Sequence, residues 1–270
     1  MTGRVSRPTD SPALVHREPD QAADRGISVS PDAAPTEPFS VPQAELPRHM
    51  AIIMDGNRRW ARARGLAEME GHAAGVEAIR EVIRHAVRRG VEVLSLYAFS
   101  RENWARSDDE VGGLFFLLEK VIRNETDELK AQGARVRILG RMDELPPETR
   151  MSIQQAIDAT SGGRRLQLNI AFNYSGRTEL VDAARKLVAR GLRPDDIDED
   201  VLSESLYTTG LPDPDMVIRT GGDQRLSNFL IWQAAYAEMY FCPILWPDFG
   251  PAALDEAIIE FAGRQRRFGR

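Results

Sequence analysis

Residues 49–72 read HMAIIMDGNRRWARARGLAEMEGH, and this stretch decides the fold. Its apolar run 50–54 is typical of a buried strand, and the run ends abruptly at Asp55. Gly56 and Asn57 form a tight turn, and a cluster of arginines follows. A carboxylate at the carboxyl end of a strand, followed by a turn and arginines, is typical of α/β sites that bind an anion with a metal. The stretch therefore predicts one strand of a parallel sheet and part of a binding site.

Outward from this stretch, short apolar runs alternate with segments of helical periodicity. Strands are predicted at 50–54, 91–99, 135–139, 166–173, 215–219 and 238–241. Helices are predicted at 74–89, 111–131, 147–159, 178–190, 201–207, 226–236 and 252–265. This alternation predicts an α/β fold, with a single doubly wound, mainly parallel six-stranded sheet and helices on both faces.

Composition bounds the class of protein. Residues 1–45 are rich in Pro, Ser, Asp and Ala, which predicts a disordered N-terminal tail before a folded domain at 46–270. The net charge of −6 does not favour a nucleic-acid partner. Cys242 is the only cysteine and no signal-peptide or membrane-spanning pattern is present, so we expect a cytoplasmic protein.

Asp55 has two interpretations. It precedes a glycine turn and a probable helix, so it could be a helix N-cap, or it could bind Mg²⁺ beside a diphosphate. The turn that follows favours the metal, because glycine lets the backbone approach a phosphate and the forks of Arg58 and Arg59 match phosphate oxygens. His72 lies next to a predicted helix start, where a cap or packing role competes with phosphate contact.

A second anion site is predicted at residues 219–227. Arg219 ends a strand, Gly221 and Gly222 form a turn, and Arg225 and Ser227 follow. Two anion sites at neighbouring strand ends indicate two phosphorylated substrates. We expect four polar strand ends to converge on one cleft, namely those at 55, 100–104, 173–177 and 219–225. The apolar segment 114–118 has two interpretations, because it could belong to the core or line an apolar channel.

Several long motifs in one order resemble the cis-prenyltransferase family, and most of all its bacterial undecaprenyl diphosphate synthase type. They are HMAIIMDGNRRWA, GH, YAFSRENW, NIAFNYSGR, PDPDMVIRTGGDQRLSNFLIWQ, AEMYF and LWPDF. The resemblance implies a Mg²⁺-dependent enzyme that adds isopentenyl diphosphate in cis to an allylic diphosphate such as farnesyl diphosphate. It also implies a long product, about C50–C55, for a cell-wall lipid carrier.

The resemblance assigns roles to individual residues. It implies a metal-binding and catalytic role for Asp55, a second Mg²⁺ carboxylate at Glu238, and a catalytic positioning role for Asn103. The implied allylic-diphosphate site comprises Gly56, Asn57, Arg58, Arg59, Trp60 and His72. The implied loop over the reacting carbons comprises Ser100, Arg101, Glu102, Asn103, Trp104 and Arg106. The implied isopentenyl diphosphate site comprises Arg219, Arg225, Leu226 and Ser227.

The resemblance further implies a homodimer, through the C-terminal residues 267–269, and peripheral membrane contact through the product. One position departs from the family: Glu68 stands where an arginine is usual, so that contact is lost or Arg62 or Arg64 replaces it. Ala98 is small at a position expected at the floor of the channel, where a short-chain producer would have a bulkier plug, and this favours a long product. The alternatives are a short-chain synthase, a non-catalytic scaffold subunit, and a Mg²⁺-dependent phosphohydrolase that uses Asp55 as nucleophile.

Overall fold

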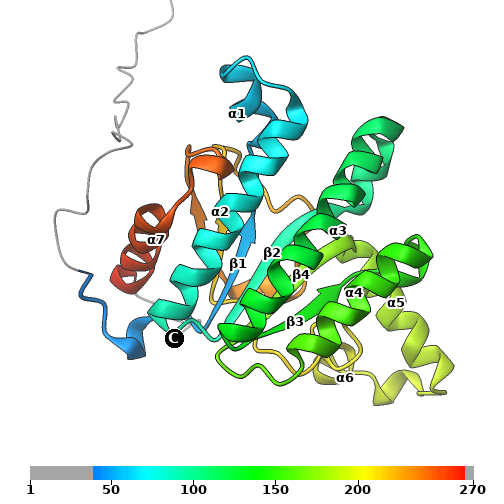
Figure 1. Ribbon diagram of the computed structural model, residues 1–270. Coiled ribbons are helices and arrows are strands. Elements are labelled where there is room, and N and C mark those ends of the chain that lie inside the picture. The colour runs from blue at the N-terminus through cyan, green and yellow to red at the C-terminus, as the bar shows by residue number, and fades with distance from the viewer. Residues whose placement is uncertain (1–38, 265–270) are drawn as a thin grey trace, which may run out of the picture. The chain divides into compact units, whose positions relative to one another are not determined.

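The computed structural model describes residues 39–264, which form a six-stranded parallel sheet in the order β3-β4-β2-β1-β5-β6 (Figure 1). The strands are β1 His49–Ile53, β2 Val93–Ser100, β3 Ala134–Leu139, β4 Leu166–Tyr174, β5 Met216–Arg219 and β6 Glu238–Phe241. The α-helices are α1 Asn57–Ala63, α2 Glu68–Arg89, α3 Asp108–Ala131, α4 Pro147–Thr160, α5 Gly176–Ala189, α6 Glu199–Ser203 and α7 Pro251–Gly263. The predicted fold class is confirmed.

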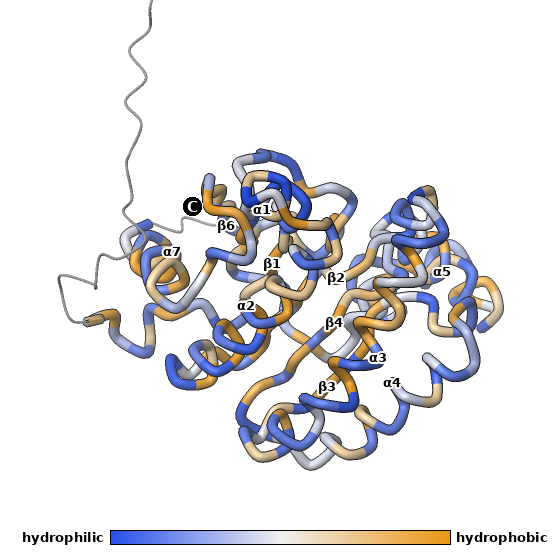
Figure 2. Tube along the Cα trace, turned by 45° about the horizontal axis from the view of Figure 1, so that its top comes forward, coloured by the Kyte–Doolittle hydropathy of each residue, from blue (hydrophilic) through white to orange (hydrophobic). Residues whose placement is uncertain are grey.

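Side chains of β1 alternate between two cores because successive residues of a strand point to opposite faces. Met50 and Ile52 pack with helices α2 and α7, whereas Ala51 and Ile53 pack with Phe229 on the other face. All four strand residues are at most 6% exposed. Figure 2 shows hydrophobic residues along the central strands and hydrophilic residues along the outer turns of the helices.

The predicted helix over 226–236 is wrong. Ser227, Asn228 and Leu230 have positive φ angles of 48°, 63° and 44°, which a right-handed helix excludes. The segment is a series of turns that ends in one 3₁₀ turn, Gln233–Tyr236. Tertiary contacts stabilise these turns, because Phe229 and Leu230 are fully buried against the sheet.

Two helix boundaries also differ from prediction. Helix α2 begins at Glu68 rather than at 74, so His72 lies in its second turn and not at its start. Helix α6 is shorter than the predicted 201–207 and begins after Asp198, whose carboxylate accepts a hydrogen bond from the Val201 amide at 2.8 Å. Across residues 39–264 no helix is both long and apolar enough to cross a bilayer.

The N-terminal part of the described chain lies against the core. Phe39 and Val41 pack on it, and the guanidinium of Arg89 lies 3.6 Å from the centre of the Phe39 ring. Most of the predicted tail, and the C-terminal residues 267–269, lie outside the described residues.

Candidate active site

Asp55 and Arg219 meet at the carboxyl edge of the sheet. Strands β1 and β5 pair with Ile53 opposite Arg219, so Asp55 lies just beyond that edge. Arg219 Nη2 donates to Asp55 Oδ2 at 2.8 Å, and Arg59 Nη2 lies 3.1 Å from Asp55 Oδ1. The Arg219 side chain is only 4% exposed. The two predicted anion sites therefore share one charged centre.

Asp55 is not the N-cap of the helix that follows it. The N-cap of α1 is Gly56, with φ +116°, and no side chain caps this helix. A Cβ at Gly56 would lie 2.9–3.1 Å from Leu245 atoms, so glycine is required both by conformation and by space. The Asp55 carboxylate is thus left free to face cations.

A second carboxylate lies beside this centre. Asp223 Oδ2 accepts from Arg219 Nη2 at 3.2 Å and from Arg225 Nη2 at 2.7 Å. Arg219 Nη1 donates to Ser227 Oγ at 2.6 Å and to the Arg225 carbonyl. The backbone of Asp55 is held by Thr220, whose hydroxyl accepts from the Asp55 amide at 3.0 Å and donates to the Asp55 carbonyl at 2.7 Å. The loop after β5 thus positions both carboxylates around one guanidinium.

Glu68 neutralises the arginines beside it. Its carboxylate lies 2.7 Å from Arg58 Nε and 2.5 Å from Arg62 Nη2. The hydrogen bonds from Arg58 and then Arg62 hold the pKa of Glu68 below its ordinary value. Arg64 lies over the Trp60 ring at 4.2 Å and pairs with Asp248.

Asn57 and His72 form the polar mouth of a cavity, and each carries a buried polar atom without a hydrogen-bond partner among the described residues, with Glu110 Oε1 at 3.7 Å from the His72 atom. These atoms are Asn57 Oδ1 and His72 Nε2. Burial is the main cause that lowers the pKa of His72, so its ring is neutral at pH 7. Orphaned polar atoms at a cavity mouth are typical of groups that pair with a ligand. Arg219 Nε is orphaned in the same way.

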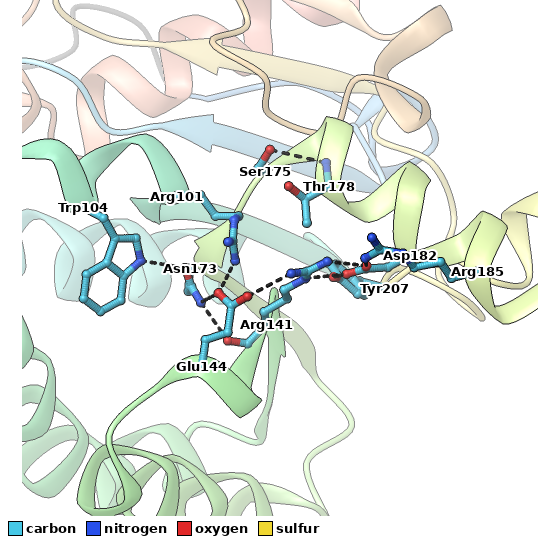
Figure 3. A network of polar contacts seen from close by, with 10 residues as sticks. All are labelled: Arg101, Trp104, Arg141, Glu144, Asn173, Ser175, Thr178, Asp182, Arg185 and Tyr207. Atoms are coloured by element: carbon cyan, nitrogen blue, oxygen red, sulfur yellow. Dashed lines mark hydrogen bonds and ion pairs between the residues drawn. The ribbon is translucent and has the colours of Figure 1, made fainter.

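The loop after β2 forms a 3₁₀ turn, Arg101–Ala105, that a polar network holds in place (Figure 3). Trp104 Nε1 donates to Asn173 Oδ1 at 2.8 Å, and Arg101 pairs with Glu144. Asn173 Nδ2 in turn donates to Glu144 Oε2 at 3.1 Å. Asn103 lies inside this turn, where its Oδ1 accepts from the Ser100 amide at 3.0 Å, so its amide NH₂ is not used in that contact.

The outer part of the network is ionic. Arg141 bridges Glu144 and Asp182, and Tyr207 donates to Asp182 (Figure 3). The hydrogen bond from Arg101 lowers the pKa of Glu144 to about 2, and that from Arg141 lowers the pKa of Asp182 to about 2. The network therefore stays charged at neutral pH.

Asn228 joins three of the strand-end loops. Its Nδ2 donates to Glu102 Oε1 at 2.9 Å and to Ser175 Oγ at 2.8 Å, while its Oδ1 accepts from the Arg177 amide. Together with the Asp55–Arg219 pair, these contacts confirm that the four polar strand ends converge. Arg106 lies at the start of α3, where it pairs with Glu110 at 2.8 Å.

An apolar cavity opens beside this charged edge, between α2, α3 and the sheet. Its empty volume, open mouth included, is about 1320 Å³. Its lining includes Phe99, Leu114, Leu117 and Leu118, while Leu114 and Leu118 also pack against the buried cluster around Phe115, so the segment 114–118 belongs both to the core and to the cavity wall. Ala98 also lines it, but near the carboxyl end of β2 and therefore near the mouth rather than at the floor.

Glu238 is not brought to Asp55 within one chain. It begins β6 opposite Met216, three positions before the register pair Arg219–Phe241 at the carboxyl edge. Its carboxylate accepts from Arg264 Nη1 at 2.9 Å.

Within residues 39–264, no cluster of three or more His, Cys, Asp or Glu side chains forms a ready metal site. A Mg²⁺ site does not require three protein ligands, because this ion is usually held by one or two carboxylates, substrate phosphates and water. Asp55 and Asp223 supply hard oxygen donors that face the same guanidinium, so these residues fit that requirement.

Several supporting residues escaped the sequence analysis. Asp223 and Asn173 lie in segments predicted to converge, but nothing in the sequence singled them out. Asn228 was placed in a predicted helix, which hid its role in a turn. Glu144 lies in a 3₁₀ turn far along the chain from Arg101, and no local pattern indicates their pairing.

Comparison with known proteins identifies the family of this chain. Residues 53–269 match the family described as "Putative undecaprenyl diphosphate synthase". Isoprenyl transferase 2 of Bradyrhizobium diazoefficiens is 50% identical over 231 residues, covering 84% of this chain and 92% of the relative. Isoprenyl transferase of Heliobacterium mobile is 47% identical over 228 residues, covering 83% and 88%.

Solved structures are similar throughout the described domain. Lavandulyl diphosphate synthase of Lavandula x intermedia, solved with dimethylallyl diphosphate, has a TM-score of 0.82 and 39% identity, covering 84% of this chain and all of that one. A probable undecaprenyl diphosphate synthase of Campylobacter jejuni has a TM-score of 0.71 and 32% identity, covering 83% and 99%. This chain therefore belongs to the undecaprenyl diphosphate synthase family of cis-prenyltransferases, and it is a prenyl transferase.

Proposed function

We propose that this enzyme condenses isopentenyl diphosphate with an allylic diphosphate such as farnesyl diphosphate, and makes a long Z-polyprenyl diphosphate of about C50–C55 by family analogy. The apolar cavity beside a doubly charged edge carries this proposal. A diphosphate would occupy the charged edge, and a hydrocarbon chain would extend between α2 and α3. The aliphatic and aromatic side chains that line the cavity, among them Leu114, Leu117 and Leu118, favour a hydrocarbon ligand.

The allylic diphosphate is assigned to the α1 side of the edge. Gly56 lets the backbone come close, and the first turn of α1 presents free amides. Arg58, Arg59 and the neutral His72 donate hydrogen bonds, and Asn57 and Trp60 complete the contacts. These donors stabilise the charge that develops on the departing diphosphate.

The isopentenyl diphosphate is assigned to the loop after β5. Arg219, Arg225 and Ser227 already gather around one point, and Leu226 lies between them in sequence. The buried guanidinium of Arg219 is held by Asp55 and Ser227, so little further ordering is needed when the ligand binds.

Asp55 would hold Mg²⁺, with Asp223 close enough to assist. When bound, the metal supplies Lewis-acid stabilisation of the leaving diphosphate. Glu238 is a second proposed ligand, although within a single chain it lies at the other end of its strand. A homodimer, which the family resemblance implies, is part of the proposal.

The loop Arg101–Ala105 would close over the reacting carbons. The substrate double bond attacks the allylic carbon, the diphosphate leaves, and a proton must then be lost from the new chain. A neutral amide is a poor base, so Asn103 is assigned to positioning, and the proton passes to diphosphate or water. Ser100, Arg101, Glu102, Trp104 and Arg106 hold this loop and its neighbours in place. We place the enzyme in the cytoplasm, with membrane contact through its product, in cell-wall lipid-carrier synthesis.

The deciding experiment incubates the protein with labelled isopentenyl diphosphate, Mg²⁺ and either farnesyl or dimethylallyl diphosphate. A ladder of long products from the farnesyl starter supports the proposal. A single short product would select the short-chain alternative, phosphate release would select a phosphohydrolase, and no reaction would select a scaffold subunit.

A further inference from the structure

The 3₁₀ turn after β2 is anchored near both of its ends, and both anchors lead to one carboxylate, that of Glu144 (Figure 3). Arg101 Nη1 donates directly to Glu144 Oε2. Trp104 Nε1 donates to Asn173 Oδ1 at 2.8 Å, and Asn173 Nδ2 donates to Glu144 Oε2 at 3.1 Å. Asn103 lies between the two anchored residues of the turn, so its placement depends on Glu144.

Glu144 accepts hydrogen bonds from segments at the carboxyl ends of three different strands. Arg101 belongs to the loop after β2, and Asn173 lies near the end of β4. Arg141, just after β3, donates to Glu144 Oε1 at 2.8 Å. An ionised carboxylate accepts all three hydrogen bonds, because it has two oxygens and no hydrogen of its own. This residue therefore joins three strand ends that lie far apart in the sequence.

The acceptor character of Glu144 also sets the orientation of the Asn173 side chain. Asn173 is fully buried, and its Nδ2 donates to Glu144 and, at 2.8 Å, to the Arg141 carbonyl. Since both of these partners can only accept, the amide must turn its NH₂ group toward them and its oxygen away. The oxygen then faces the Trp104 indole, which can only donate. Glu144 thus maintains the second anchor through Asn173.

The anchored turn borders both the cavity and the charged edge. The Trp104 ring packs against the rings of Phe99 and Phe115, at 5.7 and 5.3 Å between centres, and Phe99 lines the cavity. Glu102 of the same turn accepts from Asn228 of the loop after β5 at 2.9 Å. A displacement of the turn would therefore disturb contacts at the cavity and at the charged edge together.

We infer that Glu144 is a positioning residue for prenyl transfer, which acts by fixing the turn that carries Asn103. This inference rests on the proposed function, which places that turn over the reacting carbons. The ion pair with Glu144 also neutralises Arg101, so Arg101 holds the turn rather than binding a diphosphate. A misplacement of about 1 Å can cost about 100-fold in rate, so loss of Glu144 should lower kcat and leave KM largely unchanged.

The test compares Glu144→Gln with Asp182→Asn, which each replace one carboxylate of the same network by an amide of similar size. The network partners of Asp182 are Arg141, Arg185 and Tyr207, and none of them belongs to the turn (Figure 3). We expect Glu144→Gln to lower kcat by about 10- to 100-fold with KM changed by less than about threefold, and Asp182→Asn to keep kcat within about twofold. An unchanged kcat in Glu144→Gln, or equal losses in the two variants, would overturn the inference.

Hydrogen exchange tests the same inference without turnover. We expect the amides of residues 100–106 to exchange several-fold faster in Glu144→Gln than in the wild type or in Asp182→Asn, because the turn would open more often. If the wild type does not elongate, the proposed function fails, while faster exchange in the variant still shows that Glu144 fixes the turn. Arg101→Met, which removes the same ion pair from the turn itself, replaces Glu144→Gln if the latter does not fold. Exchange at the rate of the wild type in either variant overturns the inference.

Discussion

Arg219 holds the charged edge together through its guanidinium, and the proposed function gives the same group a role in binding isopentenyl diphosphate. It neutralises Asp55 and Asp223, it donates to Ser227, and it is almost fully buried. Arg225 lies in the same loop, but its side chain is 63% exposed and pairs only with Asp223. Two arginines predicted for one ligand therefore differ in what their loss costs the folded protein.

Replacing each arginine by alanine should separate these tasks. Arg219→Ala should lower the free energy of unfolding by about 1–3 kcal/mol, because Asp55 loses its buried partner, and it should also abolish turnover. Arg225→Ala should change stability by less than about 0.5 kcal/mol and raise KM for isopentenyl diphosphate about tenfold. Denaturant unfolding and steady-state kinetics measure both quantities. Equal stability losses would contradict this division.

On the proposed function, Glu68 would compete with the allylic diphosphate for Arg58. Its carboxylate pairs with Arg58 and Arg62, so a diphosphate that binds Arg58 would have to displace it. Glu68→Gln should therefore lower KM for the allylic substrate several-fold, and Glu68→Arg should lower it as well. The matched control is Glu70→Gln, since Glu70 is exposed and its carboxylate caps the amide of Ala67 instead. An unchanged KM in Glu68→Gln would mean that Arg58 does not contact this substrate.

At the scale of elements, α2, α3 and strands of the sheet, β2 among them, line the cavity. Ala98 has no register partner in β4, because the pairing of β2 with β4 shifts between Tyr97 and Phe99, and it shifts again between Phe99 and Ser100. The residue lines the cavity near the mouth. A larger side chain at position 98 would therefore contact a growing hydrocarbon chain after only a few units have been added.

Ala98→Leu should therefore shorten the products by several five-carbon units and leave the first condensation intact. The added methyl groups occupy space that the chain would otherwise fill, and the site is open rather than packed, so overpacking strain should be small. Thin-layer chromatography of the labelled products measures the change. A ladder identical to that of the wild type would show that the chain does not pass Ala98.

At the scale of the whole molecule, acidic groups around β4 tie distant segments together. Glu144 and Asp182 lie far from Arg101 in sequence, and Arg141 joins them. Their pKa values are about 2 in the folded protein, whereas their ordinary values are 4.5 and 3.8. Their contribution to stability is therefore complete above pH 4.5 and is lost as the pH falls toward 2.

We expect the free energy of unfolding to fall through this window by about 1–2 kcal/mol from these two groups, after allowance for solvent screening. The double variant Glu144→Gln and Asp182→Asn should be less stable at pH 7 but flatter between pH 4.5 and 2. Denaturant titrations at several pH values measure the slope. An equal slope in the variant and the wild type would mean that other carboxylates dominate acid unfolding.

The sequence by itself determined the sheet and the charged edge. Apolar runs of strand length appear directly in the residue order, and every predicted strand lies within a few residues of the observed one. Asp55, Arg219 and their loops follow strand ends, and parallel strands bring those ends to one edge. The strands depend on local residue patterns and the charged edge follows from parallel strand topology, so both could be predicted from the sequence.

Only the tertiary structure decided which groups pair and which space stays open. The segment 226–236 has helical composition, but burial of Phe229 and Leu230 holds positive φ angles that local propensity disfavours. The pairings of Glu68 with Arg58 and of Glu144 with Arg101 depend on how helices and loops meet in space. The cavity depends on the same packing, because a volume between α2, α3 and the sheet exists only once all three have been assembled.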